Sequence, residues 1–196
     1  MPGRRKVADS GTQSRAITHD KAVDEGQQAS LSNYFSSLLG ERIANQTFFL
    51  NAASVTNSLL PNAPGAFSFH PESMAAPRNE TTVSVSTIDT YSQEHSIHWI
   101  DILKTDTQGY DLCVFRGAET LLAESRVAVI LTEVLFAHLY SGQAYFEDIY
   151  IHLLHRGFRL VGLYSVSWNS QHYASWGDAL FVHPEAVARR RAKVVV

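Results

Sequence analysis

The sequence contains one cysteine and no long apolar run. Cys113 has no second thiol with which to form an internal disulfide, which is typical of proteins from reducing compartments. No apolar stretch approaches the roughly 20 residues that cross a bilayer. The N-terminal residues also lack the apolar block of a secretory signal. These absences predict a cytoplasmic protein and argue against the disulfide-stapled and membrane-spanning classes.

Charged residues are also scarce. Asp, Glu, Lys and Arg make up 18% of the 196 residues, and the formal net charge is −3. This balance provides no general attraction to nucleic acid or to a membrane surface, so we expect neither as a partner. Nine histidines are present, but their spacing to cysteine and to carboxylates matches no known metal site, and we expect no metal centre.

The chain divides into one domain and two tails. Residues 1–28 are polar, show little periodicity and carry a basic cluster at Arg4-Arg5-Lys6, a pattern typical of a disordered tail. Residues 29–184 are sufficient for one domain of ordinary size. Residues 185–196 include the stretch ARRRAK, which we interpret as a solvated basic tail, with nonspecific anion contact as the alternative.

Hydrophobic periodicity predicts an α/β fold. From Trp99 onward, strands alternate with helices, which is typical of a mostly parallel sheet. WIDILKTD and VAVILTE read as neighbouring strands joined by a helix that contains Val114 and Leu121. A second helix around Phe146–Leu154 ends at Gly157, and FRLVGLYSV and DALFVH follow without a helix between them. We therefore expect a closing hairpin with an antiparallel last strand. Upstream, QTFFLN and TTVSVSTI read as strands, separated by the loop TNSLLPNAPG.

Three carboxylates fall at one edge of this predicted sheet. Asp106 and Glu133 are the last residues of the strands WIDILKTD and VAVILTE, and Asp178 begins the antiparallel last strand. Ligands of open α/β sheets bind beyond the carboxyl ends of the strands, so the three side chains are predicted to surround one cleft. Lys104 lies on the same side of its strand as Asp106 and can keep it ionised, and Gly109 lets the following turn approach a ligand closely.

Structural roles remain open for each of these residues. Asp106 fits a helix cap or a solvated turn, Glu133 fits an ion pair with a basic neighbour, and Asp178 fits a cap on the hairpin loop. Lys104 fits a structural or electrostatic role better than that of a nucleophile.

The motif IDILKTDTQGYDLCVFRGAETLL, followed by VILTEV, LYSGQAYFEDIYIHLLHRGFRLVGLY and GDALFV, resembles the C-terminal half of the FkbM family of S-adenosylmethionine-dependent methyltransferases. TNSLLP resembles a loop of the same family. The resemblance implies a three-layer, Rossmann-like class I methyltransferase sheet with an antiparallel last strand. It also implies methyl transfer to a hydroxyl of a small molecule or sugar, with S-adenosylmethionine as the donor.

The resemblance implies roles for eight residues. Asp106 and Glu133 are the expected catalytic pair, with Asp106 as the base or the group that orients the acceptor. Cofactor contacts are expected from Asp106, Gln108 and Gly109, and substrate contacts from Lys104, Tyr110, Asp111 and Asp178.

The sequence departs from the family in its glycines. It has 11, no two within three residues of each other, so the glycine-rich cofactor loop and the first strands of the fold are not recognisable. We therefore expect this chain alone to bind S-adenosylmethionine very weakly. Two interpretations follow: a truncated methyltransferase, or a non-catalytic methyltransferase-like domain that binds a partner. A complementing chain would supply the missing part, and a homo-oligomer stays open as a further partner.

Overall fold

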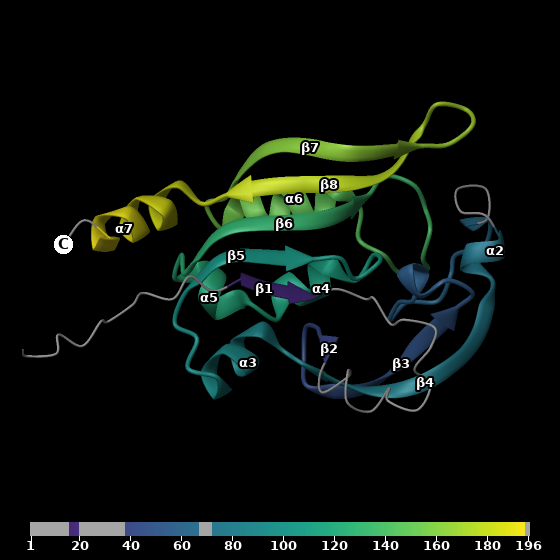
Figure 1. Ribbon diagram of the computed structural model, residues 1–196, viewed down its shortest axis with the longest axis horizontal. Coiled ribbons are helices and arrows are strands. Elements are labelled where there is room, and N and C mark those ends of the chain that lie inside the picture. Colours follow the sequence, from purple (N-terminus) through teal and green to yellow (C-terminus); the bar gives the residue numbers. More distant parts are fainter. Residues whose placement is uncertain (1–15, 20–37, 67–71, 195–196) are drawn as a thin grey trace, which may run out of the picture.

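The computed structural model describes residues 16–19, 38–66 and 72–194, which form a mixed α/β fold with two sheets (Figure 1). The larger sheet has the strand order β1-β5-β6-β8-β7. Its strands are β1 (Ala16–His19), β5 (Ile100–Thr105), β6 (Val127–Leu135), β7 (Arg159–Trp168) and β8 (Ala174–Val182). Strands β1, β5 and β6 are mutually parallel, and β8 is antiparallel to both of its neighbours.

Two predictions about this sheet are confirmed. Strands β5 and β6 are adjacent and parallel, with Thr105 opposite Thr132. Strands β7 and β8 form the expected closing hairpin, and the last strand is antiparallel. Strand β1 was not predicted and is an exception to the proposed tail at residues 1–28. The rest of that segment lies outside the described residues, so its boundary stays a prediction.

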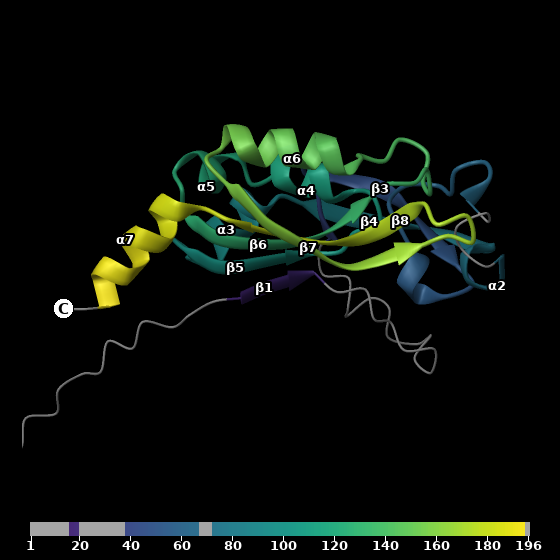
Figure 2. The same ribbon diagram turned by 90° about the horizontal axis from the view of Figure 1, so that it is seen from above.

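Three helices lie along one face of the larger sheet (Figure 2). They are α4 (Asp111–Arg116), α5 (Glu119–Ala123) and α6 (Phe146–His155). Their apolar side chains and the facing strand residues form the main core, which includes Phe115, Leu121, Ile130, Leu153 and Phe181. Helix α6 ends as predicted, and Gly157 follows it with a φ of 87°.

The single helix predicted between β5 and β6 is divided into α4 and α5 at Gly117. A Cβ atom at residue 117 would lie 2.0 Å from the carbonyl oxygen of Gly40. The chain leading out of β2 therefore packs directly against the break, and only a residue without a side chain fits there.

A three-stranded sheet lies beside the larger one (Figure 1). Strand β4 (Pro77–Ser86) pairs with β2 (Leu38–Leu39) in parallel and with β3 (Ala44–Asn51) in antiparallel orientation. QTFFLN is thus confirmed as a strand, and TTVSVSTI is confirmed up to Ser86, because Thr87 caps helix α3, which begins at Ile88. Leu38, Phe48, Val83 and Val85 form a small core of this sheet. The shorter elements are η1 (Ser54–Thr56), α2 (Glu72–Ala75) and α3 (Ile88–Glu94).

The face of the larger sheet opposite α4–α6 is more open. Ile102 on β5 points to that face and is 46% exposed, so the three-layer arrangement stays a prediction. Helix α7 (Pro184–Val194) follows β8, and within it Arg190 contacts Asp101 of β5. Among the described residues, no helix is long and apolar enough to cross a membrane.

Candidate functional site

The three predicted carboxylates form a row across neighbouring strands. Glu133 of β6 lies directly opposite Asp178 of β8 in the antiparallel register. Side chains of such pairs point to the same face, with Cβ atoms about 4.5–5.5 Å apart. Asp106 follows the last paired residue of β5, Thr105, which lies opposite Thr132, so Asp106 and Glu133 come at the same level of the sheet.

Gln108 links the first two carboxylates. Its Nε2 donates to Oδ1 of Asp106 and to Oε2 of Glu133, each at 2.8 Å. The two carboxylate oxygens therefore lie no further apart than twice that distance, as the prediction of one shared cleft requires. One neutral amide holds two acidic groups, both half-buried, at the carboxyl edge of the sheet.

The turn that carries Gln108 is strained. Gln108 and Gly109 both have left-handed backbones, with φ values of 53° and 87°. Glycine adopts this conformation freely, whereas glutamine does so at an energetic cost. The carbonyl of Gln108 accepts a hydrogen bond from Ser58 Oγ at 2.9 Å. The loop TNSLLP thus supports the turn from the side of the smaller sheet.

Tyr140 completes the site and was not predicted from the sequence. Its hydroxyl donates to Oε1 of Gln108 at 2.7 Å and lies 3.3 Å from the carbonyl oxygen of Thr56. Gln143 shapes the loop around it by accepting from the backbone N–H groups of Leu139 and Tyr140. Tyr140 belongs to the stretch LYSGQ, but nothing in the local sequence indicates that a loop after β6 reaches the turn after β5.

Burial and charge act together on Tyr140. Its side chain is 1% exposed. Desolvation raises the pKa of the phenol far above its ordinary value, and the negative charges of Glu133 and Asp106 raise it further. The hydroxyl is therefore protonated at any physiological pH and acts as a permanent donor to Gln108, which fixes the direction of the glutamine amide.

Asp111 lies inside the turn. It is 1% exposed and accepts hydrogen bonds from the backbone N–H of Thr107 and from Thr132 Oγ1. Thr132 in turn accepts from Thr105 Oγ1 at 2.8 Å. These contacts brace the turn against β5 and β6 from within. The predicted substrate contact of Asp111 stays a prediction.

Tyr110 and Lys104 lie at the margins of the cluster. The Tyr110 hydroxyl donates to Oε1 of Gln46 on β3 at 3.2 Å, and burial raises the pKa of this phenol. It therefore joins the turn to the smaller sheet. Lys104 is half-buried and lies two residues before Asp106, on the same side of the strand by period-two alternation. The substrate contacts predicted for both residues stay predictions.

Within the described part of the chain, no group of three or more histidine, cysteine, aspartate or glutamate side chains has a geometry suited to a metal ion. The arrangement is instead suited to hydroxyl groups and to positively charged organic groups. Carboxylates accept hydrogen bonds from hydroxyls, and a row of carboxylates attracts positive charge.

The fold and the site together define an α/β protein with an acidic cluster at the carboxyl edge of a mixed sheet. A family model, the methyltransferase FkbM domain, matches residues 16–160. The match covers most of the chain, so the protein belongs to the FkbM methyltransferase family. No curated protein and no solved structure matches the chain significantly.

Proposed function

We propose that this protein is an S-adenosylmethionine-dependent O-methyltransferase whose acceptor is a hydroxyl group of a small molecule or a sugar. Membership of the family supports methyl transfer. The observation that carries the hydroxyl acceptor is the pair of carboxylates, Asp106 and Glu133, held at one point by Gln108.

In this proposal Asp106 orients the acceptor hydroxyl and takes its proton. Both Nε2 hydrogens of Gln108 are committed to the two carboxylates, so an acceptor O–H reaches Asp106 through a free lone pair or by displacing one amide hydrogen bond. A carboxylate that removes the proton as the new bond forms is an effective general base. Glu133 and Asp178 hold further hydroxyl groups, and Gln108 is a positioning residue.

The residues present fit S-adenosylmethionine in part. When bound, the cofactor supplies an electrophilic methyl group on a positively charged sulfur. The carboxylate row suits that charge. A closely spaced glycine pair, whose backbone N–H groups would hold the rest of the cofactor, is missing from the sequence.

Binding by this chain alone is therefore proposed to be weak. Each lost charge-assisted hydrogen bond weakens binding by about 1.5–3 kcal/mol, and about 1.4 kcal/mol is a tenfold change in affinity. Loss of two or three shifts a micromolar dissociation constant to the millimolar range. Calorimetric titration of the chain tests this, and micromolar affinity would show that another segment replaces the glycine loop.

Methyl transfer is tested with radiolabelled S-adenosylmethionine near its solubility limit and a panel of sugars and small alcohols. Asp106→Asn should reduce product formation by a factor of about 10²–10⁴, the usual range for a general base. Glu133→Gln should reduce it by at least about tenfold, the loss expected for one charge-assisted hydrogen bond. Glu94→Gln is the matched control, because Glu94 is exposed on α3. Equal rates for the two site variants and the control would refute the assigned roles.

A second candidate is a non-catalytic domain that binds a partner. The lack of a glycine pair favours it, and so does the internal amide that already occupies both carboxylates. Its partner would then be a complementing chain or a second copy of this chain. If the chain neither binds the cofactor nor transfers a methyl group, but forms a stable complex in sedimentation experiments, this alternative replaces the first.

A further inference from the structure

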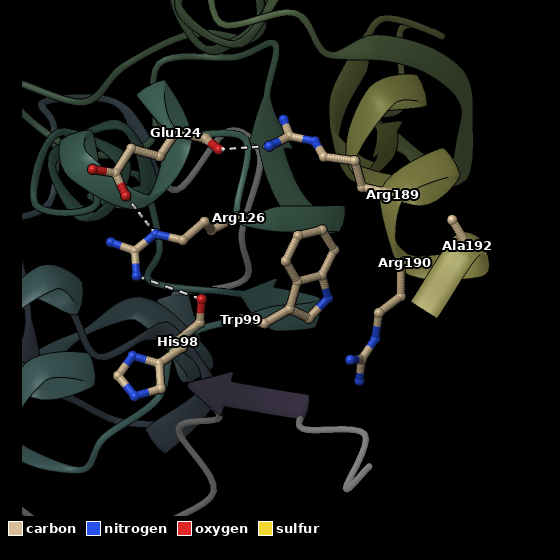
Figure 3. A pocket seen from close by; sticks show the side chains of 7 residues that line it. All are labelled: His98, Trp99, Glu124, Arg126, Arg189, Arg190 and Ala192. Atoms are coloured by element: carbon tan, nitrogen blue, oxygen red, sulfur yellow. Dashed lines mark hydrogen bonds and ion pairs between the residues drawn. The ribbon is translucent and has the colours of Figure 1, made fainter. Parts of the chain in front are cut away.

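A hollow of about 670 Å³ lies at the opposite edge of the larger sheet from the carboxylate row (Figure 3). It is lined by His98, Trp99, Glu124, Arg126, Arg189, Arg190 and Ala192. His98 and Trp99 precede β5, and Arg126 precedes β6, so the hollow is at the amino ends of these strands. The length of β5 places it roughly 20 Å from Asp106 at about 3.3 Å per residue.

The lining is basic although the whole chain is acidic. Three arginines face one glutamate, whereas the formal net charge of the chain is −3. The arginines come from two segments: Arg126 from the loop before β6, and Arg189 and Arg190 from α7. The fold therefore brings three guanidinium groups to one place, and two of them are paired with carboxylates.

Two of these arginines are fixed in place. Arg190 contacts both carboxylate oxygens of Asp101, at 2.8 and 3.2 Å, and its guanidinium lies 5.8 Å from the centre of the Trp99 ring. Trp99 donates from its indole nitrogen to the same aspartate. Arg126 forms an ion pair with Glu124, in which Nε lies 2.7 Å from Oε2. The indole and the two guanidinium groups are thus already oriented before any ligand arrives.

Arg189 is different. It is exposed, and its described contact is a weak hydrogen bond of 3.5 Å to the carbonyl oxygen of Glu124. Within the described part of the chain, no carboxylate pairs with Arg189. Figure 3 shows its guanidinium at the same hollow as Trp99 and Arg126. Its charge is therefore available to an anion that enters the hollow.

We propose that this hollow binds a small organic phosphate. The phosphoryl group lies between Arg189 and Arg126, because guanidinium groups bind phosphate oxygens with strong, charge-assisted hydrogen bonds. The organic part packs against the indole of Trp99, which provides an apolar wall. The volume is within the usual range for small-molecule sites, about 300–1,000 Å³. This site is independent of methyl transfer.

The test is calorimetric titration of the full chain with phenyl phosphate, inorganic phosphate and phenol. Phenyl phosphate lacks adenosine, so it does not imitate the methyl donor at the other edge. We expect saturable one-to-one binding of phenyl phosphate, weaker binding of inorganic phosphate and no binding of phenol. Affinity should fall as ionic strength rises from about 0.01 to 0.15 M, because the screening length shrinks from about 30 to 8 Å.

Substitution identifies the site. Arg189→Ala should weaken phenyl phosphate binding at least about tenfold, the loss expected for one charge-assisted contact. Arg191→Ala is the matched control, because Arg191 is an exposed arginine of the same helix that does not line the hollow, and it should bind like the unmodified chain. Arg189→Lys should retain part of the affinity. Because Arg189 is exposed, circular dichroism should show all three variants folded.

Several results would overturn the proposal. Absence of phenyl phosphate binding would do so, as would equal weakening by Arg189→Ala and Arg191→Ala, which would indicate nonspecific attraction to α7. Equal affinities for phenyl phosphate and inorganic phosphate would show that the organic part of the ligand and Trp99 do not contribute to binding.

Discussion

The left-handed Gly109 provides the sharpest test of how the turn after β5 is built. Replacing it with alanine adds one methyl group in a confined position. The new Cβ would lie 2.9 Å from Cβ of Gln143, 3.3 Å from Leu135 and 3.4 Å from Tyr140. Because the nearest of these atoms is fixed to the backbone, the loop that carries Gln143 and Tyr140 has to move.

Two effects add in this variant. A residue with a side chain is destabilised in the left-handed conformation by about 1–2 kcal/mol, and overpacking adds about 1–3 kcal/mol. We expect Gly109→Ala to lower the free energy of unfolding by about 2–5 kcal/mol. At an m-value of about 2 kcal/mol per molar urea, the midpoint of unfolding falls by about 1–2.5 M.

Gly65 offers a matched control. It has nearly the same backbone, with a φ of 85°, but no atom lies within 4 Å of the position that an added methyl group would take. Gly65→Ala should therefore show the backbone effect alone, about 1–2 kcal/mol. Urea unfolding of the two variants, followed by circular dichroism, isolates the packing effect as their difference. If Gly109→Ala is no less stable than Gly65→Ala, the close packing of the turn against Tyr140 and Gln143 is refuted.

Three further predictions follow from named contacts. Tyr140→Phe removes the donor to Gln108 Oε1 and should lower the free energy of unfolding by about 1–3 kcal/mol, the usual effect of an unsatisfied buried acceptor; an unchanged urea midpoint would contradict this. Burial, and secondarily the charge of Arg156, lowers the pKa of His152 from 6.5 to about 4, so the unfolded chain binds more protons between these values and stability should fall as pH drops from 6.5 toward 4. His152→Gln should reduce the change in melting temperature between pH 6.5 and 4. An unchanged pH dependence would show that other groups cause it. A double-mutant cycle of Asp101→Asn and Arg190→Gln should give a coupling of about 1.5–3 kcal/mol, because the ion pair is bidentate and mostly buried; additive effects would show that α7 is not anchored by it.

Hydrophobic periodicity and the order of strands and helices along the chain were enough to predict which strands carry the carboxylates of the site. Two consecutive strands that each end in a carboxylate, joined by a helix, implied that Asp106 and Glu133 meet at one edge of a parallel sheet. The absence of a helix between the last two strands implied that Asp178 starts at that same edge. The registers of β5, β6 and β8 confirm that the three residues lie side by side on neighbouring strands. The predicted strand ends were wrong, because β6 and β8 stay paired as far as Leu135 and Trp176. Asp178 is therefore the fifth residue of β8, and β6 continues two residues beyond Glu133.

What escaped prediction depends on contacts between distant segments. Ser58 and Tyr140 reach Gln108 across separations of 50 and 32 residues, and no local pattern records such contacts. The break at Gly117 has the same origin, because it depends on the approach of Gly40 from another sheet. Strand β1 is four residues long, too short for an alternating pattern to distinguish it from polar chain.

The conformation of Gln108 connects the stability of the turn to its proposed chemistry. A left-handed backbone at a residue with a side chain persists only where surrounding contacts compensate for it, and such contacts are present on both sides of this residue. Its carbonyl accepts from Ser58, and its side chain bonds to Asp106, Glu133 and Tyr140. A glycine would relieve the backbone but would leave the two carboxylates facing each other without the amide between them. The strained backbone of Gln108 is therefore the consequence of placing one neutral donor between two acidic groups. A ligand hydroxyl that displaces this amide also breaks a hydrogen bond that holds the strained turn in place.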